Sequence, residues 1–505
     1  ALTVGLILGT FAVNLVPSLW YVHQHGANTA VARHAAESEL YGLKLTGMIL
    51  PREGHRLPGF ANLTASYRDP SPVPSERGQS LGLIGAAGLA YLLIVAGLSL
   101  AGGRRLSPTG GDRSLRAGHT IPDGDRHLSL LAVALVAVGT VGGLSSLVAL
   151  FLSPQIRSWN RLSIYIGFLA LFGLARQAER LRAHLRARGH GPLAFAAVLV
   201  AVLAVGIADQ TSGADVPRYR TVSTAYHSDG AFVAAVEAML PTNAMVFQLP
   251  IRAFPEVRGP VDMSVSDPFR LYLHSDDLRW SFGGVAGRPT ADWQTPLAAQ
   301  PPAELLPRLS AVGFSGLAVD RFGYDDRAAA LEAALRAELG DPAEVSPDGR
   351  FSFFDLRTDG GQQNESIRDL ALNPTRIGWT GVTGLGHDPL DRLGTAQQQF
   401  TITFSNPDTV PRTLRFRLGI EGAATSPPVQ ATLPDGATMD IPLTDGRAVV
   451  DRTLTVPPGT TQAVFTTEGL PISDVAATKA ERYHLRLTDP AIYDVLPAGA
   501  PRAAE

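Results

Sequence analysis

The chain has 505 residues, of which 43 are lysine or arginine and 46 are aspartate or glutamate, and it contains no cysteine. The lack of cysteine excludes a disulfide scaffold, a thiolate metal site and a cysteine nucleophile. Only 18% of the residues are charged and the mean hydropathy is +0.09, which is unlike a disordered chain and more apolar than most soluble proteins.

Charge divides the chain into two halves. Residues 1–208 have a net charge of +9, whereas residues 209–505 have a net charge of −12. The basic residues of the first half lie between long apolar runs and not on an aromatic-rich surface, which argues against nucleic acid as a partner. The pattern predicts an apolar part within a membrane and an acidic part outside it.

Five apolar runs in the first half predict a bundle of about five transmembrane helices. A spanning helix needs about 20 mostly apolar residues. The second and third runs meet this length, and the fourth is short. The alternative for each run is a buried helix of a soluble core. The runs cover roughly residues 1–22, 81–102, 128–152, 162–175 and 192–208.

The connections between the runs predict the orientation of the bundle. Arginines are concentrated within residues 104–126 and 176–188. Because short basic loops stay in the cytoplasm, the segment 23–80 and everything after residue 209 are expected on the outer side of a bacterial inner membrane. The chain starts inside an apolar run with no basic flank, unlike a signal peptide. This start favours a fragment of a longer protein that has further helices before it.

The outer segment 23–80 is long enough to have its own structure. Residues 37–50 are predicted to form an amphipathic helix, and the sequence PREGHRLPGF follows it. Lys44, His55 and Arg56 bring positive charge near the expected membrane surface, where they are candidates to bind the phosphate of a lipid-linked donor. The alternative is that they contact lipid headgroups.

Two further groups of polar residues are expected beside the membrane. Glu37 and Glu39 in the outer segment are candidate general bases, or else solvated surface acids. Arg157 and Arg161 lie in the turn between the third and fourth apolar runs. They fit contact with lipid headgroups or with the anionic part of a substrate.

Three pieces of the sequence resemble bacterial polytopic membrane proteins of the C-type glycosyltransferase superfamily. The resemblance implies transfer of a sugar from a polyprenyl-phosphate donor at the outer face of the membrane. It also implies a catalytic Asp or Glu in the first outer loop. In a complete chain Glu37 or Glu39 takes that place, and in a fragment the residue lies outside this chain. The pieces, scattered over residues 1–358, are ELYGLKLTGMILPREGHRLP, IRSWNRLSIYIGFLALFGL and FRLYLHSDDLRWSFGGVAGR.

Residues 223–358 alternate between helix and strand patterns, which predicts a small periplasmic α/β domain. Three short apolar runs are typical of strands, and three longer amphipathic or alanine-rich stretches are typical of helices. The predicted strands are 244–249, 316–320 and 350–356, and the predicted helices are 228–239, 302–312 and 325–339.

A long insert in this domain, residues 251–294, mixes aromatic rings with planar polar side chains, as carbohydrate sites do. Arg279 and Trp280 are expected to contact sugar. The alternative is that the aromatic side chains anchor the core or face the membrane.

Metal and cofactor motifs are not found in the chain. Asp267, His274 and Asp276 in the insert are able to ligate a hard metal, but their spacing matches no closed motif. There is also no Walker loop, no dinucleotide GxGxxG after a strand, no HExxH and no GxSxG. We therefore predict neither a metal nor a cofactor.

Residues 372–470 contain short alternating runs separated by NPD, PDG, TDG and PPGT turns. This spacing predicts an antiparallel β-sandwich. It has no aromatic platform, so a role as spacer or packing module is favoured over glycan binding. Residues 471–505 are expected to form a C-terminal extension that is disordered from Pro497 onward.

The predicted fold is thus an α-helical transmembrane bundle over residues 1–208, followed by a periplasmic α/β domain and a β-sandwich. The predicted function is a glycosyltransferase-like step with a polyprenyl-phosphate sugar in assembly of an envelope polysaccharide or glycolipid. Expected partners are the bilayer, the lipid-linked sugar donor and a glycan or glycolipid acceptor. The alternative is a non-catalytic, membrane-anchored binding or assembly protein. A transporter is less favoured because the apolar runs carry almost no charge.

Overall fold

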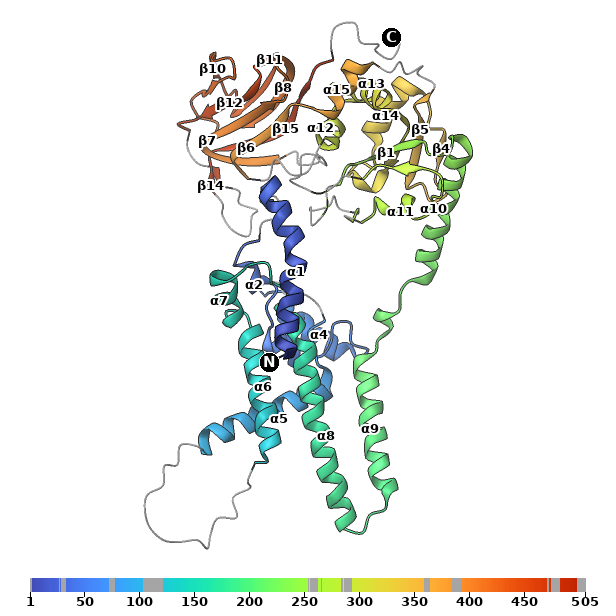
Figure 1. Ribbon diagram of the computed structural model, residues 1–505, viewed down its shortest axis with the longest axis vertical. Helices are drawn as coiled ribbons and strands as arrows, with labels where there is room; N and C mark the ends of the chain where they lie inside the picture. Colours follow the sequence, from blue (N-terminus) through green and yellow to red (C-terminus); the bar gives the residue numbers. More distant parts are fainter. Residues whose placement is uncertain are drawn as a thin grey trace. The chain divides into compact units, whose positions relative to one another are not determined.

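A computed structural model of the chain shows a helical first half followed by a second half rich in sheets (Figure 1). Its contacts group into two compact units, Ala32–Tyr219 and Ala1–Val31 together with Arg220–Glu505. The structure describes residues 2–26, 28, 33–71, 78–102, 121–252, 254, 262–264, 266–282, 285, 293–357, 364–383, 393–469, 472–473 and 482–496.

Three helices are long and apolar enough to cross a membrane, among the residues that the structure describes. They are α1 (Leu2–His25), α5 (Gly82–Gly102) and α9 (Pro192–Gln210), which match the first, second and fifth apolar runs. The side chains of α1 from Thr3 to Ile7 and from Gly9 to His25 are exposed. These three helices support a membrane protein.

The third apolar run does not form the single helix that its composition predicts. It is divided into α6 (Asp123–Gly139) and α7 (Leu144–Phe151). Gly142 has a φ of +70°, which is outside the helical region. The Leu43 amide also donates a hydrogen bond to the Gly139 carbonyl oxygen at 2.7 Å, so the outer segment pairs with the chain at this break. The fourth run forms the first part of α8 (Ser163–Ala187), whose last turns are basic.

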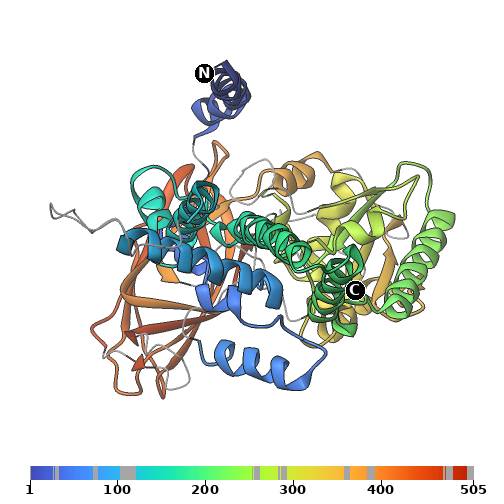
Figure 2. The ribbon, with the colours of Figure 1, turned by 90° about the horizontal axis from the view of Figure 1, so that it is seen from below.

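Small residues allow α5 to cross α8 closely. A Cβ added at Gly88 would overlap the backbone oxygen of Ala170, which is the kind of close contact that small residues permit between membrane helices. Figure 2 shows α5 lying across the view, whereas α8 and α9 are seen more nearly end-on. The start of α6 joins them through Asp125, which accepts hydrogen bonds from Tyr91 Oη at 2.7 Å and Arg176 Nε at 2.6 Å.

The α/β part of the second unit is built on a five-stranded sheet with the strand order β2-β1-β3-β5-β4. The first three strands are parallel, and β5 and β4 run antiparallel. The three strands predicted from the sequence are confirmed as β1, β3 and β5. The strands are β1 (Met245–Leu249), β2 (Arg279–Trp280), β3 (Phe314–Asp320), β4 (Glu344–Val345) and β5 (Phe351–Asp355).

Helices bury apolar side chains on both faces of this sheet. The helix α13 (Pro302–Val312) begins and ends as predicted. The helix α10 (Tyr219–Met239) begins nine residues before its predicted start. The helix α14 (Ala329–Leu339) begins later than predicted, because Arg327 and Ala328 have positive φ angles that end the helical path before it. The shorter helices are α11 (Phe269–Tyr272), α12 (Gln294–Ala298) and α15 (Glu365–Leu372).

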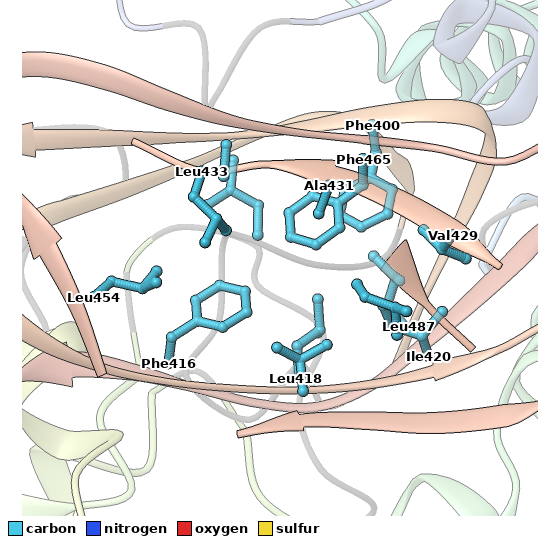
Figure 3. Packing of buried hydrophobic residues seen from close by; sticks show 14 of the residues in the cluster. Phe400, Phe416, Leu418, Ile420, Val429, Ala431, Leu433, Leu454, Phe465 and Leu487 are labelled. Carbon is cyan, nitrogen blue, oxygen red and sulfur yellow. The ribbon is translucent and has the colours of Figure 1, made fainter. Parts of the chain in front are cut away.

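The C-terminal part is an antiparallel sheet of eight strands, ordered β10-β9-β12-β7-β15-β8-β11 with β6 beside β7. Its halves face each other across a core that includes Phe400, Phe416 and Phe465 (Figure 3). The expected β-strands are confirmed, because alternate residues point into this core. The strands are β6 (Arg376–Thr383), β7 (Leu393–Asn406), β8 (Arg412–Glu421), β9 (Val429–Thr432), β10 (Thr438–Ile441), β11 (Arg447–Val456), β12 (Gly459–Thr466) and β15 (Leu485–Asp494), with β13 (Ile472–Ser473) and β14 (Arg482–Tyr483) as a separate pair.

This sheet reaches beyond residue 470, where the sequence predicts a separate extension. The strand β15 is hydrogen-bonded to both β7 and β8 and contributes Leu485 and Leu487 to the core. It therefore belongs to the interior of the sheet. The prediction of disorder after Pro497 lies outside the described residues.

A buried arginine connects the α/β part with this sheet. The Arg308 side chain on α13 is 1% exposed and donates hydrogen bonds to the Asp494 carbonyl oxygen at 2.5 Å and to Glu304 Oε2 at 2.8 Å. Burial lowers the pKa of Arg308, and the Glu304 carboxylate partly opposes that shift. A buried hydrogen bond from Arg308 to the backbone of β15 thus joins the two parts of this unit, while the ion pair of Arg308 with Glu304 lies within α13.

Candidate functional site

The outer segment folds differently from the single helix expected over residues 37–50. It forms α2 (Glu37–Leu40) and α3 (Leu45–Ile49), followed by α4 (Pro58–Arg68). Between the first two, Leu43 makes an isolated parallel bridge with Thr140. Gly42 permits this contact, since a Cβ there would lie 3.0 Å from Val141 Cγ2. Pairing with the break between α6 and α7 overrides the helical pattern, and the prediction of one helix is wrong.

One group of predicted site residues meets at α2, and we call Glu37, Tyr41 and Arg157 the Arg157 cluster. Arg157 Nη1 donates a hydrogen bond to Glu37 Oε2 at 2.6 Å, and the guanidinium carbon lies 4.7 Å from the centre of the Tyr41 ring. Burial raises the pKa of Glu37, but the hydrogen bond and charge of Arg157 outweigh it, and the net pKa is lowered. Glu37 is therefore a weaker proton acceptor than a free carboxylate.

Glu39 and Arg161 lie outside this cluster. Both side chains are exposed. Within the described part of the chain, neither side chain makes a hydrogen bond or an ion pair, so both are accessible to solvent and to a ligand. Lys44 is half-buried, and its Nζ donates to Ser71 Oγ at 2.8 Å. These three residues are not brought together with Glu37 by direct contacts.

A second group surrounds the C-terminal end of α9, and we call Arg52, His55, Arg56, Asp209 and Asp215 the α9 clasp. Arg52 pairs with Asp215, and its Nη1 donates to the Gln210 carbonyl oxygen at 2.5 Å. Arg56 Nη2 donates to the Thr211 carbonyl oxygen at 2.8 Å and to Thr211 Oγ1 at 2.6 Å. The carbonyl groups that end a helix lack helical partners and favour positive charge, which explains why two arginines gather here.

The centre of the α9 clasp is a buried pair. His55 Nε2 lies 3.4 Å from Asp209 Oδ1, and both side chains are 3% exposed. The Leu57 amide donates to His55 Nδ1 at 3.0 Å, which places the proton of the neutral imidazole on Nε2, facing the carboxylate. Asp209 Oδ2 accepts a hydrogen bond from the Leu83 amide at 2.8 Å, in the first turn of α5. Asp209 therefore joins the end of α9 to the start of α5.

The two predicted sugar contacts lie in the α/β part, on β2. Arg279 is exposed, and its Nε donates to the Asn243 carbonyl oxygen at 2.8 Å. Trp280 is half-buried and packs against the core that contains Phe232 and Phe353. Trp280 thus contributes to the core, and only part of its ring is available to a ligand.

Sequence reasoning missed Arg52, Asp209 and Asp215, which hold the α9 clasp together. The signal for Asp209 is its position, because it is the acidic residue that ends the last apolar run. An ionisable residue at the end of a membrane helix needs a partner, and the basic sequence PREGHR supplies it. The described residues contain no group of three or more His, Asp or Glu side chains placed to hold a metal ion.

No protein-family profile and no curated protein sequence matches this chain. Among solved structures, the chain is similar to the arabinofuranosyltransferase AftD from mycobacteria, with 13% identity, a TM-score of 0.28, and coverage of 92% of this chain and 44% of that one. It is also similar to a family 35 carbohydrate-binding module from an environmental isolate, with 17% identity, a TM-score of 0.14, and coverage of 25% of this chain and 94% of the module.

A third solved structure is the exo-β-1,3-galactanase of Phanerochaete chrysosporium, with 13% identity and a TM-score of 0.14. The match covers 24% of this chain and 27% of the galactanase. The chain therefore spans less than half the length of both the galactanase and AftD.

Proposed function

We propose that this chain is part of a glycosyltransferase-like protein of the bacterial inner membrane, acting on a sugar carried by a polyprenyl phosphate at the outer face. The α9 clasp is the observation that carries the proposal. It places Arg52, His55 and Arg56 at the end of a helix apolar enough to cross a membrane. A lipid-linked donor has the same two parts, an anionic phosphate joined to a long apolar chain.

The chemistry of the clasp suits a phosphate that arrives from the membrane. Arg56 is exposed, and among the described residues its hydrogen bonds are with the neutral groups of Thr211 and not with a carboxylate. A phosphate would therefore add a charge-assisted hydrogen bond to Arg56 without breaking an ion pair. Arg161, which is also exposed, and Arg157 are proposed to assist by positive charge.

The catalytic base stays unassigned in this proposal. Transfer needs a carboxylate to deprotonate the acceptor hydroxyl while the lipid phosphate leaves. Glu37 is held by Arg157 and has a lowered pKa, which makes it the less suitable of the two candidates. Glu39 is exposed and free of that arginine, and a carboxylate from outside this chain serves equally well.

The second candidate function is a non-catalytic binding or assembly protein for envelope polysaccharide. The pairing of Arg52 with Asp215 favours it, because that arginine is already neutralised by the protein. In this case the α9 clasp only fastens the outer segment to α9.

Sugar transfer by membranes that contain the protein tests the proposal. We would supply radiolabelled polyprenyl-phosphate sugars and compare the unaltered protein with Arg56→Ala, Arg56→Lys and the double variant His55→Ala/Arg56→Ala. Transfer is expected to fall at least ~10-fold in Arg56→Ala, as for loss of about 1.4 kcal/mol of binding. It should partly return in Arg56→Lys, which keeps the charge.

Thr211→Ala is the matched control. It removes a hydrogen-bond partner of Arg56 but leaves the positive charge in place. Equal loss of transfer in Thr211→Ala and Arg56→Ala would mean that Arg56 fastens α9 and does not bind donor. No transfer from any donor by the unaltered protein would favour the binding or assembly function.

A further inference from the structure

A row of side chains on α8 is aromatic at one end and basic at the other. Phe168 and Phe172 are 65% and 46% exposed, and the centroids of their stacked rings lie 6.1 Å apart. Arg176 and Arg180 continue the row at the same spacing, with side chains 37% and 41% exposed. Because residues four apart are neighbours on a helix surface, these side chains form one ridge, which we call the α8 ridge.

A buried carboxylate holds both arginines of the α8 ridge in place. Asp125, near the start of α6, has a side chain that is only 1% exposed. It accepts a hydrogen bond from Arg176 Nε at 2.6 Å and pairs with Arg180 Nη2 at 2.5 Å. Gly124 makes room for this approach, since a Cβ there would lie 2.7 Å from Arg176 Nη2. The two guanidinium groups are therefore positioned before any ligand binds.

The arginines keep both charge and hydrogen-bond donors for a ligand. One carboxylate opposes two guanidinium groups, and the only acidic residue of α8, Glu179, pairs with Arg182 instead. The Nη groups of Arg176 make no hydrogen bond among the residues that the structure describes. The planar donors of arginine match the oxygens of a phosphate. The basic end of the α8 ridge is thus suited to an anion.

The surroundings of the α8 ridge favour a lipid over a free anion. The helix packs closely on α5, which is apolar enough to cross a membrane. The apolar part of α8, residues 163–175, is about 20 Å long, whereas the hydrocarbon core of a bilayer is about 30 Å thick. Arg176 and Arg180 are therefore expected at the edge of that core, where an arginine needs an anionic partner.

We propose that the α8 ridge binds an anionic phospholipid, with the phosphate at Arg176 and Arg180 and an acyl chain along Phe168 and Phe172. A phospholipid has the same order of parts, because its charged phosphate is joined to apolar chains. Basic sites between membrane helices bind anionic headgroups in this way. The α8 ridge shares no residue with the α9 clasp or the Arg157 cluster, so the inference does not depend on sugar transfer.

Native mass spectrometry of the full chain in detergent tests the site. The probes are dioleoyl phosphatidylglycerol, which is anionic, and dioleoyl phosphatidylcholine, which has the same acyl chains and no net charge. We expect the dissociation constant of phosphatidylglycerol to be at least ~5-fold lower than that of phosphatidylcholine. Arg180→Gln should remove most of this preference, because one arginine near a membrane surface changes the binding of anionic lipid about 5-fold.

Arg182→Gln is the matched control. It makes the same change on the same helix, at a side chain that is 39% exposed and pairs with Glu179. The preference for phosphatidylglycerol should remain in this variant. Arg180→Lys keeps the charge but not the planar group, so an intermediate preference is expected. Hydrogen exchange of the α5 and α8 amides shows whether Arg180→Gln is folded, and if it is not, Arg180→Lys is compared with Arg182→Lys.

A soluble phosphate and a second copy of this chain are the alternative occupants. Glycerol 3-phosphate carries a phosphate without acyl chains and should not displace phosphatidylglycerol. Displacement at equal concentration would overturn the inference in favour of a soluble anion. A dimer that Arg180→Gln dissociates would overturn it in favour of a second copy. Equal binding of the two lipids, or equal loss of the preference in Arg180→Gln and Arg182→Gln, would leave no specific lipid site on the α8 ridge.

Discussion

Pairs of arginine and carboxylate occur in two regions of this molecule in opposite surroundings. In the α9 clasp, the side chains of Arg52 and Asp215 are 22% and 46% exposed. At the carboxyl edge of the α/β sheet, those of Arg350 and Asp320 are 8% and 6% exposed. The same chemical pair is therefore screened by water in the first region and desolvated in the second.

The difference separates a pair that can change partners from one that cannot. An exposed ion pair contributes little to stability, because water and salt replace it. Loss of one member of a buried pair is costly, since it leaves the other charge without a partner in the protein. We therefore expect the α9 clasp to exchange protein contacts for a ligand, and Arg350 to act as a fixed support.

Replacement of Arg350 is expected to have the largest effect. Arg350→Met leaves Asp320 buried without its guanidinium and should cost about 3–5 kcal/mol. Hydrogen exchange of the β3 and β5 amides in the full chain measures this locally, which avoids assuming a single unfolding step. Arg327→Met is the control, because that arginine is 50% exposed. Equal protection in both variants would remove the distinction between the two regions.

Asp209 is, with His55, one of the two buried members of the α9 clasp, so it should behave more like Arg350 than like Arg52. Asp209→Ala removes the acceptor of the Leu83 amide and is expected to cost about 1–3 kcal/mol. Asp209→Asn keeps an acceptor oxygen there and should cost less. The midpoint of thermal unfolding in detergent measures which of the two variants loses more stability. Equal losses in Asp209→Asn and Asp209→Ala would show that the charge beside His55 matters more than the hydrogen bond to the Leu83 amide.

The comparison can also be tested by pH at Asp229, which is 4% exposed and pairs with Arg270 at 2.6 Å. Burial raises the pKa of Asp229, and Arg270 only partly opposes it. The Asp229 carboxyl group then binds a proton more tightly in the folded state than in the unfolded state. The stability gained from this proton binding is present below the unfolded pKa of about 3.9 and is lost as the pH rises through the folded pKa.

Asp229→Asn is therefore expected to raise the stability at pH 7, because it removes a charge that burial disfavours. The advantage over the unaltered chain should shrink as the pH falls toward 4. Thermal unfolding at pH 4, 5.5 and 7 measures it. A variant that is less stable at pH 7 would mean that the ion pair with Arg270 outweighs the cost of burial.

Much of the fold follows from local patterns. The strands of the C-terminal sheet were predictable because residues such as those of β8 alternate between the core and the solvent. The break between α6 and α7 was not, because it depends on pairing of Leu43 with a segment about 100 residues away. Apolar composition is the same for one helix and for two. Only the tertiary contact separates them.

The candidate sites were less predictable than the fold. His55 and Arg56 stood out as cations near a membrane, but their partners Asp209 and Thr211 come from another helix. Asp267 was visible in the insert only as one acid among several. Its pairing with Arg350, which is 83 residues away in the chain, cannot be read from the sequence. Sequence patterns find the residue types, and the strand order brings them together.

The smallest effect is expected at the exposed pair of the α9 clasp. Arg52→Ala removes the contact with Asp215, and the midpoint of thermal unfolding should change by less than about 2 °C. The small difference should shrink further from 0.05 to 0.5 M salt, because the pair is accessible to screening ions. Arg350→Met should show almost no dependence on salt over the same range. If Arg52→Ala instead unfolds the end of α9 at every salt concentration, the α9 clasp is a structural joint. Its arginines are then not free to change partners, and the binding or assembly function becomes the better account of this region.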